Sequence, residues 1–199
     1  MTGARREAGL DRRRAVAELL RDRGDLLVVC GLGTPSYDVF AAGDHPANMY
    51  LWGAMGGSAM VGLGLALAQK RRPVTVITGD GEQLMGLGAL ATIAAKKPGN
   101  LTIIVLDNRR FGETGNQASH TGLGVELHLM AAAAGFAHAV ALGKLAEVKA
   151  YRLRLREIND GPRFATLRIS PSLPPRVLPP RDGVFLKNRF RATLGIQAN

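Results

Sequence analysis

Two short polar motifs, GDG at residues 79–81 and DN at residues 107–108, each follow an apolar segment and could bind one ligand together. The 25 residues between them are enough for one helix and one strand, so Asp80 and Asn108 should end two successive strands at one edge of a sheet. Their side chains supply oxygen ligands that suit Mg²⁺. Gly81 lets the backbone approach a phosphate, and amides at the start of a helix favour an anion. The spacing predicts a magnesium and phosphate site; the structural alternative is a glycine-rich turn and an Asn cap.

Two further glycine-rich loops could contribute to the same site. The segment GLGTPS at residues 31–36 follows an apolar run, and its Thr34 either binds a ligand or caps a helix. The segment WGAMG at residues 52–56 places Met55 25 residues before Asp80. Ligands of parallel α/β sheets bind beyond the carboxyl ends of the strands. We therefore expect the loops after the first three apolar runs to form one site.

Short apolar, β-branched segments alternate along the chain with segments of helical pattern. Buried strands are predicted at residues 26–30, 74–78, 101–106 and 164–169, with a weaker one at 138–140. Helices are predicted at residues 37–42, 56–70, 82–96, 125–134 and 144–158. The alternation predicts an α/β fold of three layers, α/β/α, with a mostly parallel central sheet. Residues 1–170 would carry the site, and residues 171–199 would form a Pro-rich, basic tail laid over this chain or a neighbour.

Composition and charge limit the class of protein. The chain has 199 residues, a formal net charge of +10 and one cysteine, Cys30, so neither an internal disulfide nor a cysteine-ligated metal site is expected. The first basic run, from Arg5 to Arg14, is interleaved with acidic residues, which favours a solvated helix with i,i+4 pairs, or docking against an acidic partner subunit, over nucleic-acid binding. Residues 49–69 carry no charge, but their five glycines and loop-like start favour a fully buried helix from about Gly56 over a membrane span. No apolar segment follows the basic start, so the cytoplasm is the expected location.

The chain resembles thiamine-diphosphate enzymes in one motif, which is GDG followed some two dozen residues later by DN. The segment WGAMG, whose Met55 stands 25 residues before Asp80, agrees with that family. The resemblance implies that Asp80, Asn108 and the main-chain carbonyl of Arg110 bind Mg²⁺. It implies that Met55 wedges between the two rings of thiamine diphosphate and that the carbonyl of Gly53 binds the cofactor's amino group. Methionine is long, apolar and adaptable, which suits such a wedge. The alternative is that Met55 is only a core residue.

The segment FGETGNQASHTG at residues 111–122 resembles a narrower group within that family. It is similar to the β subunit of sulfopyruvate decarboxylase and to the matching half of phosphonopyruvate decarboxylase, and the likeness spans about residues 30–135. It implies Glu113 and His120 as candidate proton donors or substrate ligands, with a solvated loop as the alternative for His120. The implied cofactor-binding residues are Gly33, Thr34, Gly53, Met55, Gly79, Asp80, Gly81, Glu82, Asn108, Phe111, Gly112, Glu113 and Thr114.

Two features depart from the family pattern. Glu82 stands where the family usually has a small residue beside the phosphates, and its carboxylate would repel a diphosphate if it pointed inward. Arg109 and Arg110 replace a smaller pair, and either could offset Glu82 or meet an anionic substrate. These departures bear on the substrate more than on the cofactor.

The resemblance also implies a partner. In this family a glutamate that contacts the pyrimidine ring activates the cofactor, and this glutamate comes from a separate pyrimidine-binding domain. The present chain is too short to contain that domain as well. We therefore expect a pyrimidine-binding α subunit that supplies this Glu. The implied reaction is the non-oxidative decarboxylation of a small 2-oxo acid, such as sulfopyruvate or phosphonopyruvate, to an aldehyde and CO₂. Thiamine diphosphate and Mg²⁺ are the implied cofactors.

Three alternative functions remain open at this level. A β subunit of a 2-oxo acid oxidoreductase would usually carry several cysteines for iron–sulfur clusters, whereas this chain has one. The shared motifs do not separate a decarboxylase from a carboligase similar to acetolactate synthase. A regulatory subunit that binds the cofactor without catalysis would carry the same motifs again.

Overall fold

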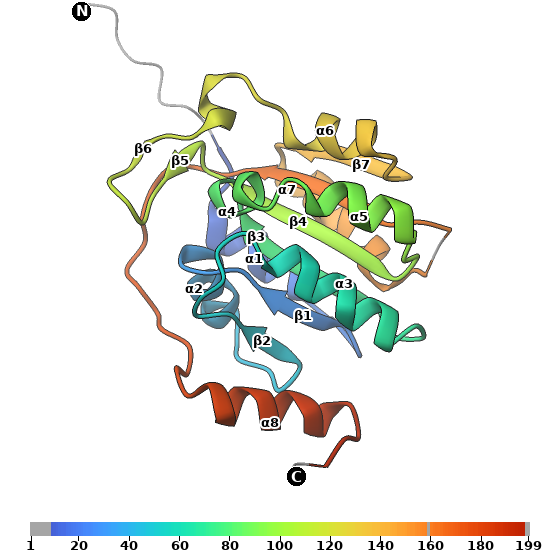
Figure 1. The fold of residues 1–199 in the computed structure, drawn as a ribbon. Coiled ribbons are helices and arrows are strands. Elements are labelled where there is room, and N and C mark those ends of the chain that lie inside the picture. Colours follow the sequence, from blue (N-terminus) through green and yellow to red (C-terminus); the bar gives the residue numbers. More distant parts are fainter. Residues whose placement is uncertain (1–8, 159, 198–199) are drawn as a thin grey trace, which may run out of the picture.

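A six-stranded parallel sheet forms the centre of the molecule (Figure 1). The computed structural model describes residues 9–158 and 160–197. The strands run in the order β2-β1-β3-β4-β8-β7, and each neighbouring pair is parallel. They are β1 (Leu27–Cys30), β2 (Asn48–Tyr50), β3 (Val74–Gly79), β4 (Leu101–Asp107), β7 (His138–Leu142) and β8 (Arg163–Arg168). A separate antiparallel ribbon consists of β5 (Arg110–Phe111) and β6 (Gln117–Ala118).

Helices cover both faces of the sheet, which confirms the predicted three-layer α/β/α fold (Figure 1). One face carries α3 (Ser58–Ala68), α5 (Ala89–Lys96) and α6 (Leu127–Ala134). The opposite face carries α1 (Arg12–Leu20), α2 (Thr34–Ala41) and α7 (Leu145–Arg152). The remaining helical segments are α4 (Asp80–Met85), α8 (Gly183–Thr193) and the 3₁₀ turns η1 (His120–Leu123) and η2 (Leu153–Arg156).

The sheet separates two apolar cores, because successive side chains of a strand point to opposite faces. On β4, Ile103 and Val105 pack in the core under α3 and α5, whereas Ile104 and Leu106 pack in the core under α1 and α7. All seven residues of this strand are buried. Burial on both faces explains why the predicted strands are continuous apolar runs rather than alternating ones.

The prediction of a solvated first helix is wrong. In α1, Ala15, Val16 and Leu19 are buried and form an apolar stripe that packs against the second core. Glu18 is also buried, and one of its oxygens lies 2.9 Å from Nη1 of Arg152 on α7. The charges of this helix therefore bind a distant element instead of forming only local i,i+4 pairs. Arg5 and Arg6 lie outside the described residues.

The helix expected from about Gly56 in the uncharged segment is α3, which begins at Ser58 after a loop, but this helix is not fully buried. Before that loop the segment also contributes β2 to the sheet. One side of α3 packs on the core, while Met60, Val61 and Leu67 on its outer side are 43%, 41% and 40% exposed. No helix in the described part of the chain is long and apolar enough to cross a membrane.

The single helix predicted at residues 82–96 is two helices, α4 and α5, with a break that begins at Gly86. A Cβ built on Gly86 would lie 2.1 Å from the carbonyl oxygen of Gly56, so only glycine allows the two backbones to come this close. The break therefore seats the Met55 loop against the end of α4.

The C-terminal tail packs against its own chain (Figure 1). Residues after β8 run past the sheet and end in α8, which packs beside β2. The indole Nε1 of Trp52 donates to the carbonyl of Pro180 at 2.7 Å, and Leu186 and Phe190 of α8 are buried in the two cores. The helix thereby covers the edge strand of the sheet, which would otherwise expose unpaired backbone groups.

Candidate active site

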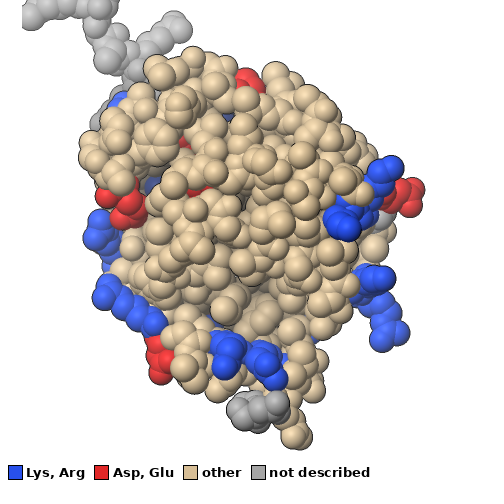
Figure 2. Space-filling model, viewed as in Figure 1, with Lys and Arg blue, Asp and Glu red and all other residues tan. Residues whose placement is uncertain are grey.

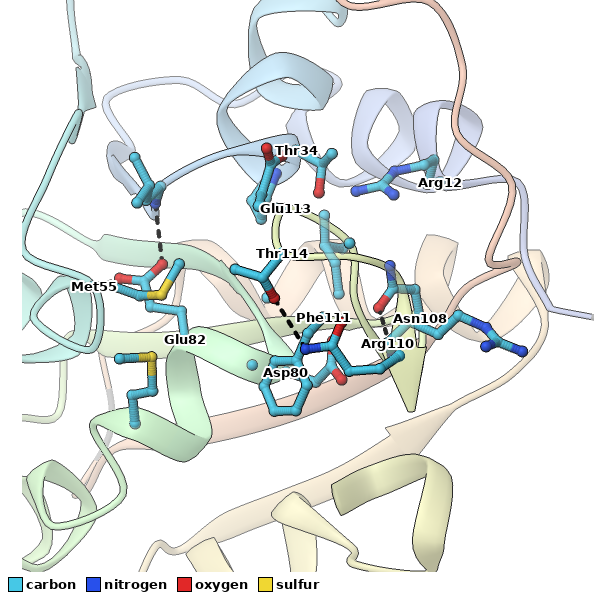
Figure 3. A pocket seen from close by; sticks show the side chains of 18 residues that line it. Arg12, Thr34, Met55, Asp80, Glu82, Asn108, Arg110, Phe111, Glu113 and Thr114 are labelled. Atoms are coloured by element: carbon cyan, nitrogen blue, oxygen red, sulfur yellow. Dashed lines mark hydrogen bonds between the residues drawn. The ribbon is translucent and has the colours of Figure 1, made fainter. Parts of the chain in front are cut away.

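A cavity of about 420 Å³ opens at the carboxyl ends of β1, β3 and β4 (Figure 3). Loops that follow all three strands contribute to its walls, as the sequence predicts for a parallel sheet. Twelve of the predicted residues line it, namely Thr34, Met55, Gly79, Asp80, Gly81, Glu82, Asn108, Arg110, Phe111, Gly112, Glu113 and Thr114. Gly33, Gly53 and His120 do not line this cavity.

Asp80 is a buried carboxylate held by hydroxyl groups. Its Oδ2 accepts hydrogen bonds from Ser119 Oγ at 2.5 Å and from Thr121 Oγ1 at 3.1 Å. The pKa of Asp80 is raised to about 6, chiefly by burial and also by the carboxylate of Asp107, although the two hydroxyl donors oppose this rise. Among the described residues no basic side chain forms an ion pair with Asp80, so its buried charge lacks a cation.

Asn108 lies beside Asp80 because β3 and β4 are paired in register up to Gly79 and Leu106. The side-chain Oδ1 of Asn108 accepts a hydrogen bond from the backbone N–H of Arg110 at 3.0 Å. That contact folds the loop and leaves the second lone pair of the amide oxygen available to a metal. No group of three or more His, Cys, Asp or Glu able to hold a metal occurs in the part described, so any ion here would rely on amide and carbonyl oxygens besides Asp80.

Glu82 does not point at the predicted phosphate position with a free carboxylate. Its oxygens accept hydrogen bonds from the backbone N–H of Leu32 at 3.1 Å, the backbone N–H of Ser58 at 3.3 Å and Thr78 Oγ1 at 2.8 Å. Backbone amides, rather than an arginine, thus compensate its charge. One side chain of α4 thereby ties the loop after β1 to the start of α3.

Met55 lies at one end of the cavity, on a loop held by the close approach of Gly56 and Gly86 (Figure 3). Its side chain is 39% exposed, so it is not simply a core residue. Gly53 belongs to the same loop but is exposed and off the cavity wall. An apolar side chain at the open end of a cavity would contact both a bound ligand and any molecule that covers it.

The two candidate proton donors are in different places. Glu113 lines the cavity, and its Oε2 lies 3.7 Å from Nη2 of Arg176 in the C-terminal tail. Gly33 packs against Glu113, since a Cβ there would be 2.9 Å from its Oε1. His120 is exposed and lines a separate neighbouring cavity, where its ring packs edge-on against Phe111 at 6.1 Å between centroids. The structure therefore brings Glu113, but not His120, to the main cavity.

Other residues reach the site without having been predicted there. The cavity is also lined by Arg12, Leu32, Pro35, Met85, Leu106 and Gln117. Ser119 and Thr121 stand within the SHTG motif, so their hydroxyls were a signal that the sequence offered. Arg12 stands 68 residues before Asp80 with no motif around it, and nothing local in the sequence indicates its role.

These features define the class of site. A buried carboxylate, an Asn oxygen and the amides at the start of α4 suit a metal ion with a phosphate group. The apolar wall formed by Met55, Leu106 and Phe111 suits the rings of a larger ligand. The orphaned charge of Asp80 and this division into a polar and an apolar end fit thiamine diphosphate with a divalent cation.

Comparison with known families agrees with that class. The family described as "Thiamine pyrophosphate enzyme, C-terminal TPP binding domain" matches residues 35–159. The chain belongs to this family, which confirms the predicted kind of domain. In the Rhodococcus jostii RHA1 thiamine diphosphate-dependent 4-hydroxybenzoylformate decarboxylase, 34% of the chain aligns with 85% of this one, with a TM-score of 0.70 and 21% identity. Benzoylformate decarboxylase from Polynucleobacter necessarius gives a TM-score of 0.69 at 22% identity, over 36% of that chain and 88% of this one. At these identities, the two structures support the fold alone.

Curated relatives are more similar in sequence. The sulfopyruvate decarboxylase subunit beta of Methanothermobacter thermautotrophicus is 43% identical over 127 residues, which cover 64% of this chain and 68% of that one. The phosphonopyruvate decarboxylase of Streptomyces viridochromogenes is 41% identical over 183 residues, which cover 90% of this chain but 44% of that one. This chain therefore spans less than half of the single-chain relative.

Proposed function

We propose that this chain is the cofactor-binding β subunit of a thiamine-diphosphate- and Mg²⁺-dependent decarboxylase that converts a small 2-oxo acid to an aldehyde and CO₂. The observation that carries the proposal is the convergence of Asp80, Asn108 and Met55 on one cavity. It occurs in a chain 43% identical to a subunit named for sulfopyruvate decarboxylation.

Each end of the cavity has its own task in this proposal. Asp80, Asn108 and the carbonyl of Arg110 hold Mg²⁺, and the amides around Gly79 and Gly81 meet the diphosphate. Thr34 and the loop from Gly112 to Thr114 complete the polar end, and Met55 and Phe111 contact the rings. When bound, thiamine diphosphate would supply the electron sink for the electron pair that stays on the substrate carbon when CO₂ leaves. The protein binds, bends and shields it from water, and Glu113 faces the substrate.

A partner subunit is the second part of the proposal. The face that carries α3, α5 and α6 is almost free of charge, with basic and acidic side chains at its rim (Figure 2). Exposed apolar side chains from α3, α4 and α6 gather on it, namely Met60, Val61, Leu67, Met85, Leu129 and Met130. An apolar patch of this kind indicates a protein interface. A pyrimidine-binding subunit docked there would close the open end beside Met55 and bring the glutamate for the pyrimidine ring.

The substrate is proposed to carry a second anionic group. Support comes from the relatives, whose names specify sulfopyruvate and phosphonopyruvate, and from Arg110 on the cavity wall. A guanidinium matches sulfonate and phosphonate oxygens in geometry and charge.

The test combines this chain with a candidate pyrimidine-binding subunit and measures CO₂ release with thiamine diphosphate and Mg²⁺. Sulfopyruvate or phosphonopyruvate should be turned over, and pyruvate and benzoylformate should be much poorer substrates. The chain alone should release no CO₂ from any of the four acids. Turnover by the chain alone would overturn the requirement for a partner, and a strong preference for pyruvate would overturn the dianionic substrate.

A further inference from the structure

Arg12 is a buried arginine at the wall of the main cavity. It is the first residue of α1, is 2% exposed, and its Nε donates to Oδ2 of Asp38 on α2 at 2.5 Å. Arg13, the next residue, donates to the carbonyl of Pro175 in the tail, and its Nε lies 3.8 Å from Oδ1 of Asp38. Asp38 therefore lies near both arginines, but of the two only Arg12 lines the cavity.

The guanidinium of Arg12 has hydrogen-bonding capacity that the protein does not use. Its Nη1 is fully buried and has no hydrogen-bond partner among the described residues. A guanidinium carries five N–H donors in a fixed fork, and Asp38 engages it through Nε. Leaving a buried, charged donor unpaired is costly, because water no longer solvates it. A site built in this way lacks an acceptor that a ligand can supply.

The position of Arg12 tells which part of a ligand it would meet. In Figure 3, Arg12 lies on the side of the cavity where Thr34 and Asn108 lie, and Met55 lies at the opposite end. The metal ligands and the amides of α4 belong to the polar part of the cavity, so a diphosphate would lie nearer to Arg12 than the cofactor rings would.

We propose that Arg12 is a cofactor-binding residue whose guanidinium donates from Nη1 to an oxygen of the terminal phosphate. This inference rests on the proposed function and adds to it a residue outside the segment that the family match covers. A planar guanidinium suits phosphate oxygens, and charge-assisted hydrogen bonds of this type are short and strong. Asp38 holds the side chain in place and balances its charge while no phosphate is bound, so that α1 can pack before the cofactor arrives.

The test measures ligand binding to the full chain by calorimetry, with Mg²⁺ present and inorganic pyrophosphate or thiamine diphosphate as the probe. Arg12→Gln should weaken both probes roughly 10- to 100-fold, the range for losing a hydrogen bond to a charged group. It should also reduce the preference for thiamine diphosphate over thiamine monophosphate, because the terminal phosphate is the group recognised. Arg12→Lys keeps the positive charge but not the forked guanidinium, so its affinity for both probes should lie between those of the unchanged protein and Arg12→Gln.

Further measurements separate a role in phosphate binding from a purely structural role of Arg12. Asp38→Asn keeps an oxygen for Nε of Arg12, so this variant should retain most of the affinity for both probes. If it instead loses as much affinity and as much thermal stability as Arg12→Gln, the pair is only structural. Normal binding by a folded Arg12→Gln or Arg12→Lys variant would overturn the proposal. A raised KM for the 2-oxo acid with unchanged pyrophosphate affinity would assign Arg12 to the substrate and would also overturn it. Asp80→Ala tests the site itself: if it binds normally, the proposed function fails, whatever Arg12 does.

Discussion

Asp80 is a carboxylate whose surroundings favour a bound cation. It is buried, its charge has no basic partner among the described residues, and Ser119 and Thr121 fix its orientation from a loop that is 39 residues further along the chain. Hydroxyl donors that hold a metal ligand commonly tune its affinity. The carboxylate therefore has the position and the support that a magnesium ligand needs.

At this scale the first prediction concerns the metal. Asp80→Ala should lower the Mg²⁺-dependent affinity for thiamine diphosphate by more than about 100-fold, and Asn108→Ala by roughly 10- to 100-fold. Calorimetry on the assembled enzyme measures both. Asp44→Ala is the control, because Asp44 pairs with Arg189 far from the cavity and should leave the cofactor affinity unchanged. Unchanged affinity in both site variants would refute the assignment of the metal site.

The second prediction concerns Met55. Met55→Ala should leave cofactor affinity largely intact but slow the exchange of the C2 proton of the cofactor by roughly 10- to 100-fold, because the bent geometry is less well supported. Deuterium uptake at C2 measures this rate. Ile196→Ala is the control, since Ile196 is similarly exposed, at 42%, and lies off this cavity and outside the proposed docking face. Equal exchange rates in the two variants would mean that another side chain supports the bend.

Elements meet at this site through Glu82, which belongs to α4 and binds the backbone of two other segments. Its oxygens occupy the space beside Gly31, where a Cβ would lie 2.0 Å from Oε2. Gly31 is therefore required by the close approach of Glu82 and of Thr78, whose Oγ1 would lie 2.7 Å from the same Cβ. The carboxylate that departs from the family pattern acts in this structure as a link between loops, which removes the expected conflict with a diphosphate.

The third prediction tests this link. Gly31→Ala should destabilise the fold by about 1–3 kcal/mol through overpacking, and Glu82→Ala by about 1–3 kcal/mol because the amides of Leu32 and Ser58 lose their acceptor. The double variant should be less damaged than the sum of the two, by at least about 0.5 kcal/mol. Urea unfolding gives these free energies. Gly64→Ala is the control: it has open space around its Cβ in the middle of α3, so it should not destabilise the fold and should stabilise it by up to about 1 kcal/mol. Strict additivity would contradict the contact.

One face of the molecule is almost free of charge, and the charged side chains visible in that view lie mainly at its rim (Figure 2). Its exposed methionines are adaptable side chains that suit a binding surface. The C-terminal tail ends in α8, which lies beside the edge strand β2 (Figure 1). The tail therefore leaves the face that carries α3, α5 and α6 uncovered. Under the proposed function, this face next to the open end of the cavity is where the partner subunit would dock.

The fourth prediction belongs to this scale. Met60→Glu should weaken heteromer formation by roughly 100-fold or more, because an unpaired charge would be buried at the interface. Analytical ultracentrifugation of the mixed subunits measures the assembly. Val184→Glu on α8 is the matched control: its side chain is 64% exposed and lies on another surface, so it should assemble normally. Normal assembly of Met60→Glu would place the partner on a different face.

The sequence by itself determined the sheet and most of the site. Apolar runs marked the buried strands, and the spacing of GDG and DN placed Asp80 and Asn108 at the ends of paired strands, since parallel strands align their carboxyl ends. Local periodicity did not reveal β2, the break between α4 and α5, or the burial of α1. These depend on what packs against each segment, and short strands and glycine breaks carry little local signal.

Only the tertiary structure decided which side chains complete the site. The hydrogen bonds from Ser119 to Asp80, from Ser58 and Leu32 to Glu82, and from Arg12 to Asp38 each join segments that are 24 to 50 residues apart. No pattern of period 2 or 3.6 encodes such pairs, because they form only after the loops meet at the sheet edge. The same physics kept His120 off the main cavity, with Phe111 packed against its ring, although the motif around it was recognisable from sequence.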